Sequence, residues 1–158
     1  MQISRRAAAV GAAILTGLAT LGAAGAAFAS PSAPATHDSA QVLHLLAVPV
    51  TAVNNSAGHG GPGDVLAVLF AIRDSTGAKV GKESVSLVAM PGHQSLGHST
   101  FVLKGGQIDA MGNVADTATR FTAAIIGGTG IYEGVTGQIR NVQTPSGSLN
   151  LTFFIIRP

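Results

Sequence analysis

The segment G-G-T-G-I-Y-E-G-V-T-G-Q-I, residues 127–139, holds five glycines in thirteen positions and decides the fold. Gly128 and Gly130 resemble part of a dinucleotide- or phosphate-binding loop, but the third glycine is missing at its required spacing and no helical pattern follows. Glycine adopts positive φ freely and lets two backbones approach closely. The segment therefore predicts a tight connection between two strands.

Short apolar runs rich in β-branched residues flank this segment, separated by clusters of Gly, Pro, Asn and Asp. Such runs are typical of strands joined by turns. We expect eight strands, at residues 43–53, 65–73, 79–90, 99–104, 107–111, 120–126, 137–144 and 148–156. Eight short antiparallel strands indicate an all-β closed barrel or a sandwich, because both architectures remove or protect sheet edges.

The fourth and fifth expected strands are joined by a Gly-Gly pair at residues 105–106, which predicts a two-residue hairpin turn. That turn would place Phe101 opposite Ala110 across the hairpin. The residues between the third and fourth strands, 91–97, are expected to form a loop.

The first 29 residues have the form of a secretion signal. Arg5 and Arg6 precede an apolar run at residues 7–26, and A-F-A at residues 27–29 is the small-x-small pattern that signal peptidase cleaves. A retained membrane anchor is the alternative, since about 20 apolar residues span a bilayer. Alanine and glycine dominate this run, which disfavours insertion. We predict a secreted protein, exported by the Sec or the twin-arginine route.

Removing residues 1–29 changes the charge balance of the chain. The nine Lys and Arg residues include Arg5 and Arg6, so seven remain against seven acidic residues. This near-neutral balance gives no basis for nucleic acid or an anionic membrane as a partner, and we expect no membrane association after cleavage. Residues 30–41, rich in Pro, Ala, Ser and Thr, predict a flexible leader, and residues 42–158 predict a single β-barrel domain.

The five histidines form no recognisable metal motif. His93 and His98 are close in sequence, and His59 lies in a glycine-rich loop, but a zinc site usually adds a carboxylate or a third close ligand. We expect no metal site. The chain also has no cysteine, so neither a disulfide nor a thiolate ligand is available.

Two motifs carry a resemblance to a known family. The run I-I-G-G-T-G-I-Y-E-G-V-T-G-Q-I at residues 125–139 resembles the signature of the allene oxide cyclase barrel family and of the related plant dirigent proteins, and K-G-G-Q-I-D-A-M-G at residues 104–112 resembles the preceding hairpin. The resemblance implies an eight-stranded antiparallel barrel, often trimeric, with an apolar pocket and no metal or organic cofactor. The plant cyclases steer ring closure of a fatty-acid epoxide, and dirigent proteins steer radical coupling of phenols.

The resemblance does not carry over a set of catalytic residues. The plant cyclases place a glutamate and an asparagine on their first strand, and dirigent proteins an aspartate, but residues 44–53 hold no carboxylate or amide. The cysteine of the cyclases is absent as well. The sequence therefore leaves the catalytic residues unknown and leaves open whether the protein is an enzyme.

Alternation along the expected strands places one set of side chains inside the barrel. The candidate ligand-binding residues of this set are Glu83, Phe101, Phe121, Asn141, Gln143 and Phe153. An apolar lumen would raise the pKa of Glu83 and let it act as an acid or base. The competing interpretation, which we expect from sequence, places Glu83 at a barrel rim, solvated or paired with Lys82 or a cross-strand arginine.

Residues 43–50 and 65–72 are largely apolar on both strand faces, so we expect their outer face to be buried between subunits of a homo-oligomer, a trimer by the family resemblance. Three functions stay open. The first is binding a small hydrophobic molecule and steering its cyclisation or coupling, as a cofactor-independent cyclase, isomerase-like or stereo-directing protein. The others are a non-catalytic, lipocalin-like carrier and a surface-associated structural barrel.

Overall fold

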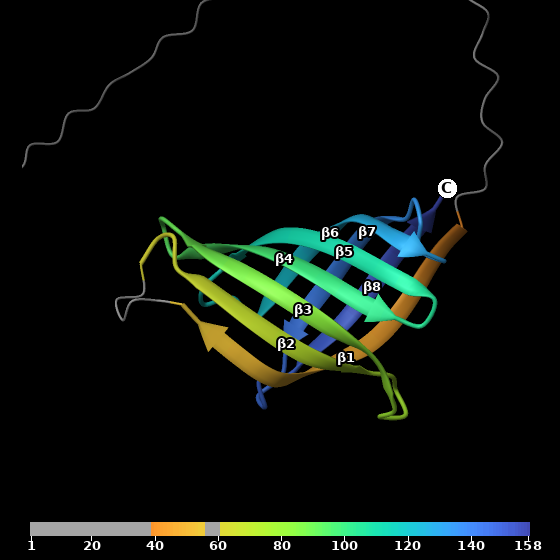
Figure 1. Ribbon diagram of the computed structural model, residues 1–158, viewed down its shortest axis with the longest axis horizontal. Helices are drawn as coiled ribbons and strands as arrows, with labels where there is room; N and C mark the ends of the chain where they lie inside the picture. Colours follow the sequence, from red (N-terminus) through yellow and green to blue (C-terminus); the bar gives the residue numbers. More distant parts are fainter. Residues whose placement is uncertain (1–38, 56–60) are drawn as a thin grey trace, which may run out of the picture. The chain divides into compact units, whose positions relative to one another are not determined.

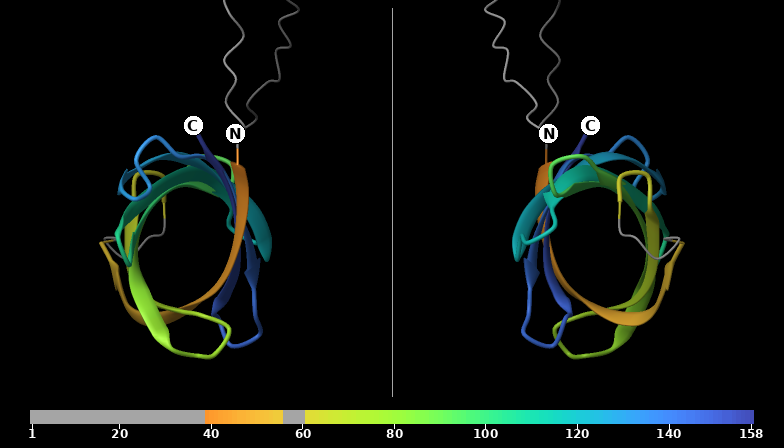
Figure 2. Two further views of the ribbon diagram at one scale, coloured as in Figure 1. Left: turned by 90° about the vertical axis from the view of Figure 1, so that its right-hand side faces the viewer. Right: turned by 90° about the vertical axis from the view of Figure 1, so that its left-hand side faces the viewer.

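The computed structural model describes residues 39–55 and 61–158, and these residues form eight antiparallel strands. The strands are β1 (Ser39–Asn54), β2 (Val65–Arg73), β3 (Lys79–Met90), β4 (Gln94–Leu103), β5 (Gly106–Ala115), β6 (Arg120–Gly130), β7 (Thr136–Gln143) and β8 (Leu149–Arg157). Each pairs with its sequence neighbours, and β8 pairs back with β1 (Figure 1). Seen end-on, the strands form a ring (Figure 2), which confirms the predicted eight-stranded antiparallel barrel.

The long strand β1 closes the barrel by pairing with two neighbours in turn. Residues 39–47 pair with β8, and residues 46–54 pair with β2. The register shifts between Pro49 and Thr51, where proline cannot donate to the sheet and a bulge bends the strand. Figure 2 shows β1, in orange, curving along the barrel wall. The strand starts at Ser39, so residues 39–41 of the expected leader pair within the sheet.

Several predictions from the sequence fall on other parts of the chain. The signal peptide at residues 1–29 and residues 30–38 of the leader lie outside the described residues, as does His59. Within the part of the chain that the structure describes, no helix is long and apolar enough to cross a membrane.

The glycine-rich segment first extends β6 and then turns the chain into β7. Residues 127–130 pair with residues 106–109 of β5, so β6 runs past its expected end at residue 126. Gly128 permits this approach, because a Cβ atom there would lie 2.6 Å from the backbone oxygen of Gln107. Gly130 and Gly134, with φ of 63° and 73°, make the turn. The predicted tight connection between strands is confirmed.

The predicted register of the β4–β5 hairpin is wrong by two residues. Phe101 faces Ile108 and not Ala110, because the turn is formed by residues 104–105. Gly105 takes the positive φ of 92° that the turn needs, whereas Gly106 begins β5. A side chain at Gly106 would overlap the backbone of β6, so glycine at this position allows β5 and β6 to lie close together. A shift of two residues preserves which side chains face inward.

The expected loop at residues 91–97 is mostly strand. β4 begins at Gln94, and residues 94–97 pair with residues 112–115 of β5. The Nδ2 atom of Asn113 donates a hydrogen bond of 2.6 Å to Oε1 of Gln94 across this pair. The local sequence Q-S-L-G lacks β-branched residues, so pairing with β5, and not local propensity, keeps it extended.

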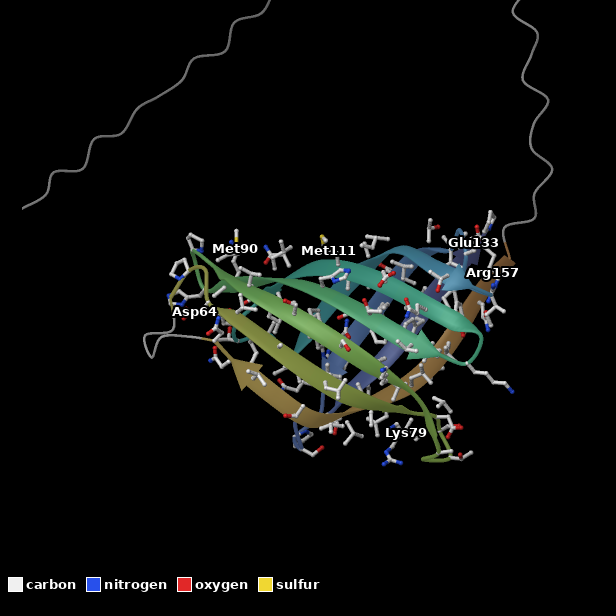
Figure 3. The ribbon with its side chains drawn as sticks, in the orientation of Figure 1. Asp64, Lys79, Met90, Met111, Glu133 and Arg157 are labelled. Atoms are coloured by element: carbon white, nitrogen blue, oxygen red, sulfur yellow. The ribbon has the colours of Figure 1, made fainter. Side chains whose placement is uncertain are left out.

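The barrel interior is filled at one end only. Large, fully or nearly fully buried side chains fill the end near the β6–β7 turn: Ile72, Ile108, Ile125, Val135, Phe153 and Ile155. Towards the other end, the inward positions of β4, β5 and β6 hold small residues: Gly97, Ser99, Ala110, Gly112 and Ala123. Figure 3 labels Glu133 at the filled end and Asp64 at the opposite end. Space inside the barrel is therefore confined to the Asp64 end.

Candidate ligand-binding cavity

A cavity of about 190 Å³ occupies the barrel interior on the side of the Asp64 end, lined by residues of β2 to β8. Near that end, the lining residues Val114 and Phe121 keep part of their surface exposed. Deeper in the barrel, Phe101 and Ala110 are buried. The cavity therefore opens at the Asp64 end and is closed at its base by the apolar core.

The cavity exists because neighbouring inward positions hold residues with little or no side chain. Gly97 of β4 and Gly112 of β5 are direct cross-strand partners. A Cβ atom added at Gly97 would lie 2.9 Å from the Leu87 side chain, which itself lines the cavity. Ala123 of β6 lines the cavity as well. Larger residues at these positions would grow into the space that a ligand needs.

Among the described residues that line the cavity, Glu83 is the one that is ionisable. It lies on β3 between two aromatic cross-strand neighbours, Phe70 on β2 and Phe101 on β4. Its side chain is 2% exposed, and its Oε2 atom has no hydrogen-bond partner among the described residues. Burial raises the pKa of Glu83 to about 7, although a hydrogen-bonding interaction with the Ser99 hydroxyl lowers it in part.

The expectation that Glu83 lies at a solvated rim is wrong. Successive residues of a strand point to opposite faces, so Lys82 lies exposed on the outer face while Glu83 points inward. Its cross-strand neighbours are phenylalanines and not arginines. The carboxyl therefore lies in an apolar environment, as the other interpretation of the sequence predicted.

The structure brings four further predicted residues to the cavity, namely Phe101, Phe121, Asn141 and Gln143. Asn141 is 4% exposed, and its Nδ2 atom donates a hydrogen bond of 3.2 Å to the Ile139 carbonyl oxygen. Gln143 is exposed at the open end. Phe153, the sixth candidate, belongs to the filled core, where its ring packs edge-to-face on Phe101 with centroids 5.0 Å apart.

Ser99 and the small residues that leave the cavity empty are not among the candidate residues predicted from the sequence. Ser99 shares the inward face of β4 with Phe101, so the same alternation points to it. Its hydroxyl is the polar group that interacts with the Glu83 carboxyl. Gly97, Gly112 and Ala123 leave space for a ligand only because strand pairing makes them neighbours. A single position in the sequence does not reveal this pairing.

No metal-binding cluster of three or more His, Asp or Glu side chains occurs among residues 39–55 and 61–158. His93 lies in the β3–β4 turn, with a positive φ of 59°, and His98 lies exposed on the outer side of β4. Neither residue lines the cavity. From the described residues, the cavity offers a ligand one carboxyl, one hydroxyl, two amides and apolar walls.

No family model and no curated protein sequence matches this chain. Solved structures do match. A pyocyanin demethylase aligns with a TM-score of 0.66 at 20% identity, covering 73% of this chain and 99% of that chain. A pterocarpan synthase dirigent protein aligns with a TM-score of 0.65 at 16% identity, covering 83% of this chain and 98% of that chain. The exo-specific intermolecular Diels–Alderase AbnU aligns with a TM-score of 0.64 at 13% identity, covering 75% of this chain and 99% of that chain.

These matches confirm the resemblance inferred from the glycine-rich segment and the hairpin before it. At identities of 13–20% the likeness concerns the fold alone. The structural neighbours of this chain are dirigent- and allene oxide cyclase-like barrels, and its described residues form a closed eight-stranded barrel of that type.

Proposed function

We propose that the barrel binds a small apolar molecule in its cavity and steers the cyclisation or coupling of that molecule. The observation that carries the proposal is the Glu83 carboxyl, buried in a largely apolar cavity with one oxygen unpaired among the described residues. Apolar walls of fixed shape favour one orientation of a flexible ligand. A carboxyl with a pKa of about 7 is able both to give and to take a proton near neutral pH.

Such chemistry needs no metal or organic cofactor, because shape and one proton-transferring group suffice. General acid–base catalysis by a positioned side chain typically contributes about 10²- to 10⁴-fold to a rate. The names of two structural neighbours, a Diels–Alderase and a pterocarpan synthase dirigent protein, support a ring-forming reaction by analogy of fold.

Two other functions are less well supported. A non-catalytic carrier would need only apolar walls, and the buried Glu83 and Asn141 are polar groups that such a carrier does not require. A purely structural barrel would have a filled interior, and the cavity of about 190 Å³ speaks against it.

Native mass spectrometry of the protein purified from its own culture medium tests the proposal. We expect the wild-type protein to carry an additional small apolar mass, and the cavity-filling variant Ala123→Leu to lose it. The recovered ligand, incubated with wild type and with Glu83→Gln, should be converted more slowly by the variant. If no mass co-purifies and apolar probe molecules fail to bind, the proposal is wrong.

We also propose that the protein is exported, with cleavage before Ser30, and that it works as a homotrimer. The apolar signal-like run at residues 7–26 supports export. Intact-mass measurement of the protein from culture medium should give a chain that begins at Ser30. A chain that still begins at Met1, recovered only from cells, would contradict export.

A further inference from the structure

We infer that the cavity selects an apolar ligand bearing a positively charged amine, which pairs with the Glu83 carboxylate, and that it rejects anionic ligands of the same shape. This inference rests on the proposed function and names its ligand class. It concerns the charge that the ligand carries into the barrel, and four features of the cavity support it.

The first feature is the lack of any positive charge around Glu83. The neighbours of Glu83 on the adjacent strands that also line the cavity include Phe70 from β2 and Ser99 and Phe101 from β4, and Asn141 from β7 lines the same cavity. None of these side chains is a cation, and among the described residues no Lys, Arg or His lines the cavity. An ionised Glu83 therefore has no counter-charge from the described part of the chain.

The second feature is the unpaired Oε2 atom of Glu83. A buried carboxylate oxygen without a hydrogen-bond donor is unfavourable, because it has lost its water and gained nothing in return. A protonated amine supplies both missing partners, a positive charge and N–H donors. A neutral alcohol supplies a donor alone, and a carboxylate would add a second negative charge to the same apolar space.

The third feature is the aromatic surroundings of the carboxyl. Phe70 and Phe101 are its direct cross-strand neighbours, and both line the cavity. The negative face of an aromatic ring attracts a cation, and this attraction grows when both are removed from water. An ammonium group held at Glu83 would lie beside these two aromatic side chains.

The fourth feature is the division of the cavity into a polar point and apolar walls. Val85, Leu87 and Phe121 line the space around and above Glu83 towards the open end. These side chains suit a hydrocarbon or aromatic skeleton that reaches from the opening to the carboxyl. Gln143, exposed at the open end, is placed to contact the outer end of such a ligand.

Three probes with one skeleton test the inference: 4-phenylbutylamine, 4-phenylbutan-1-ol and 4-phenylbutanoate. At pH 8, where most Glu83 side chains are ionised and the amine stays protonated, isothermal titration calorimetry should show the amine binding at least about tenfold more tightly than the alcohol. The carboxylate should bind more weakly than the alcohol. At pH 5.5, where Glu83 is protonated, the advantage of the amine should shrink.

Two variants connect the preference to Glu83. Glu83→Gln should bind the amine no more tightly than the alcohol, whereas Glu133→Gln, which removes an exposed carboxylate at the other end of the barrel, should keep the full preference. Ser99→Ala gives a second test that does not alter Glu83. It removes the hydroxyl that lowers the Glu83 pKa, so the pH at which the amine preference is half lost should rise.

The outcomes separate this inference from the proposed function. If the alcohol or the carboxylate binds wild type as tightly as the amine does, the amine preference is wrong and the apolar cavity still stands as a binding site. The same holds if Glu83→Gln retains the preference. If none of the three probes binds, the inference and the proposed function both fail.

Discussion

At the scale of a single residue, the Glu83 carboxyl links the stability of the barrel to pH. The folded protein keeps this proton up to pH about 7, while the unfolded chain releases it near pH 4.5. The contribution of Glu83 is therefore complete below pH 4.5 and is lost as the pH rises through 7. Relative to Glu83→Gln, the free energy of unfolding of wild type should fall by roughly 3 kcal/mol between pH 4.5 and pH 8.5.

Denaturant unfolding of both proteins at several pH values measures this difference. The comparison cancels the other titrating groups, because the two proteins differ at one position. The Glu133→Gln variant, altered at an exposed carboxylate, serves as the control for removing a carboxylate that is not buried. Parallel stability curves for wild type and Glu83→Gln would show that Glu83 titrates normally and is not buried as described.

Gly137, at the start of β7, is the residue of the glycine-rich segment that tolerates a side chain least. Its φ is 128°, and a Cβ atom there would overlap the carbonyl oxygen of Phe154 on β8. We expect Gly137→Ala to destabilise the protein by about 3 kcal/mol or more, from backbone strain and overlap together.

Gly147 provides the matched control for that substitution. It also has positive φ, 81°, but a Cβ atom there meets nothing within 4 Å. Gly147→Ala should therefore cost only the conformational part, about 1 kcal/mol. Thermal unfolding of the two variants compares them directly, and equal losses would show that strand approach at Gly137 is not the reason for its glycine.

At the scale of strands, the small residues of β4, β5 and β6 make the cavity. Filling the cavity should therefore weaken ligand binding without lowering the stability of the fold. Ala123→Leu adds apolar volume to a space that the core leaves empty. We expect its melting temperature to match or exceed that of wild type, and its affinity for 4-phenylbutan-1-ol to fall at least about tenfold. Ala124→Leu, on the outer side of the same strand, should leave binding unchanged. Unchanged binding by Ala123→Leu would place the ligand elsewhere.

Strand-level features also show how far the sequence alone predicts this protein. The bounds of β2 and β3 were predicted as observed, because both strands end at clear turn residues. The alternation of side chains correctly predicts that Glu83 and Phe101 point into the barrel. The error in the β4–β5 register does not change this prediction for Phe101, because a shift of two residues leaves each side chain on the same face of the sheet.

The cavity inside the barrel could not be predicted from single positions in the sequence. Whether an inward face encloses a cavity depends on which small residues become neighbours across strands, as Gly97 and Gly112 do. The same register decides that Phe153 packs on Phe101 in the core and does not line the cavity. Alternation predicts the face of a residue, and strand pairing predicts its neighbours.

At the scale of the whole molecule, the outer face of β1 argues for assembly. Val42, Val50 and Val53 on this strand are 53%, 62% and 63% exposed, and contact with another subunit would remove these apolar side chains from water. We expect sedimentation velocity at micromolar concentration to show a trimer. The double substitution Val50→Glu and Val53→Glu should shift it to monomer, because buried like charges oppose association. Ala124→Glu, on the outside of β6, should stay trimeric. If the wild-type protein sediments only as a monomer, this apolar face has no subunit partner and the proposed trimer is wrong.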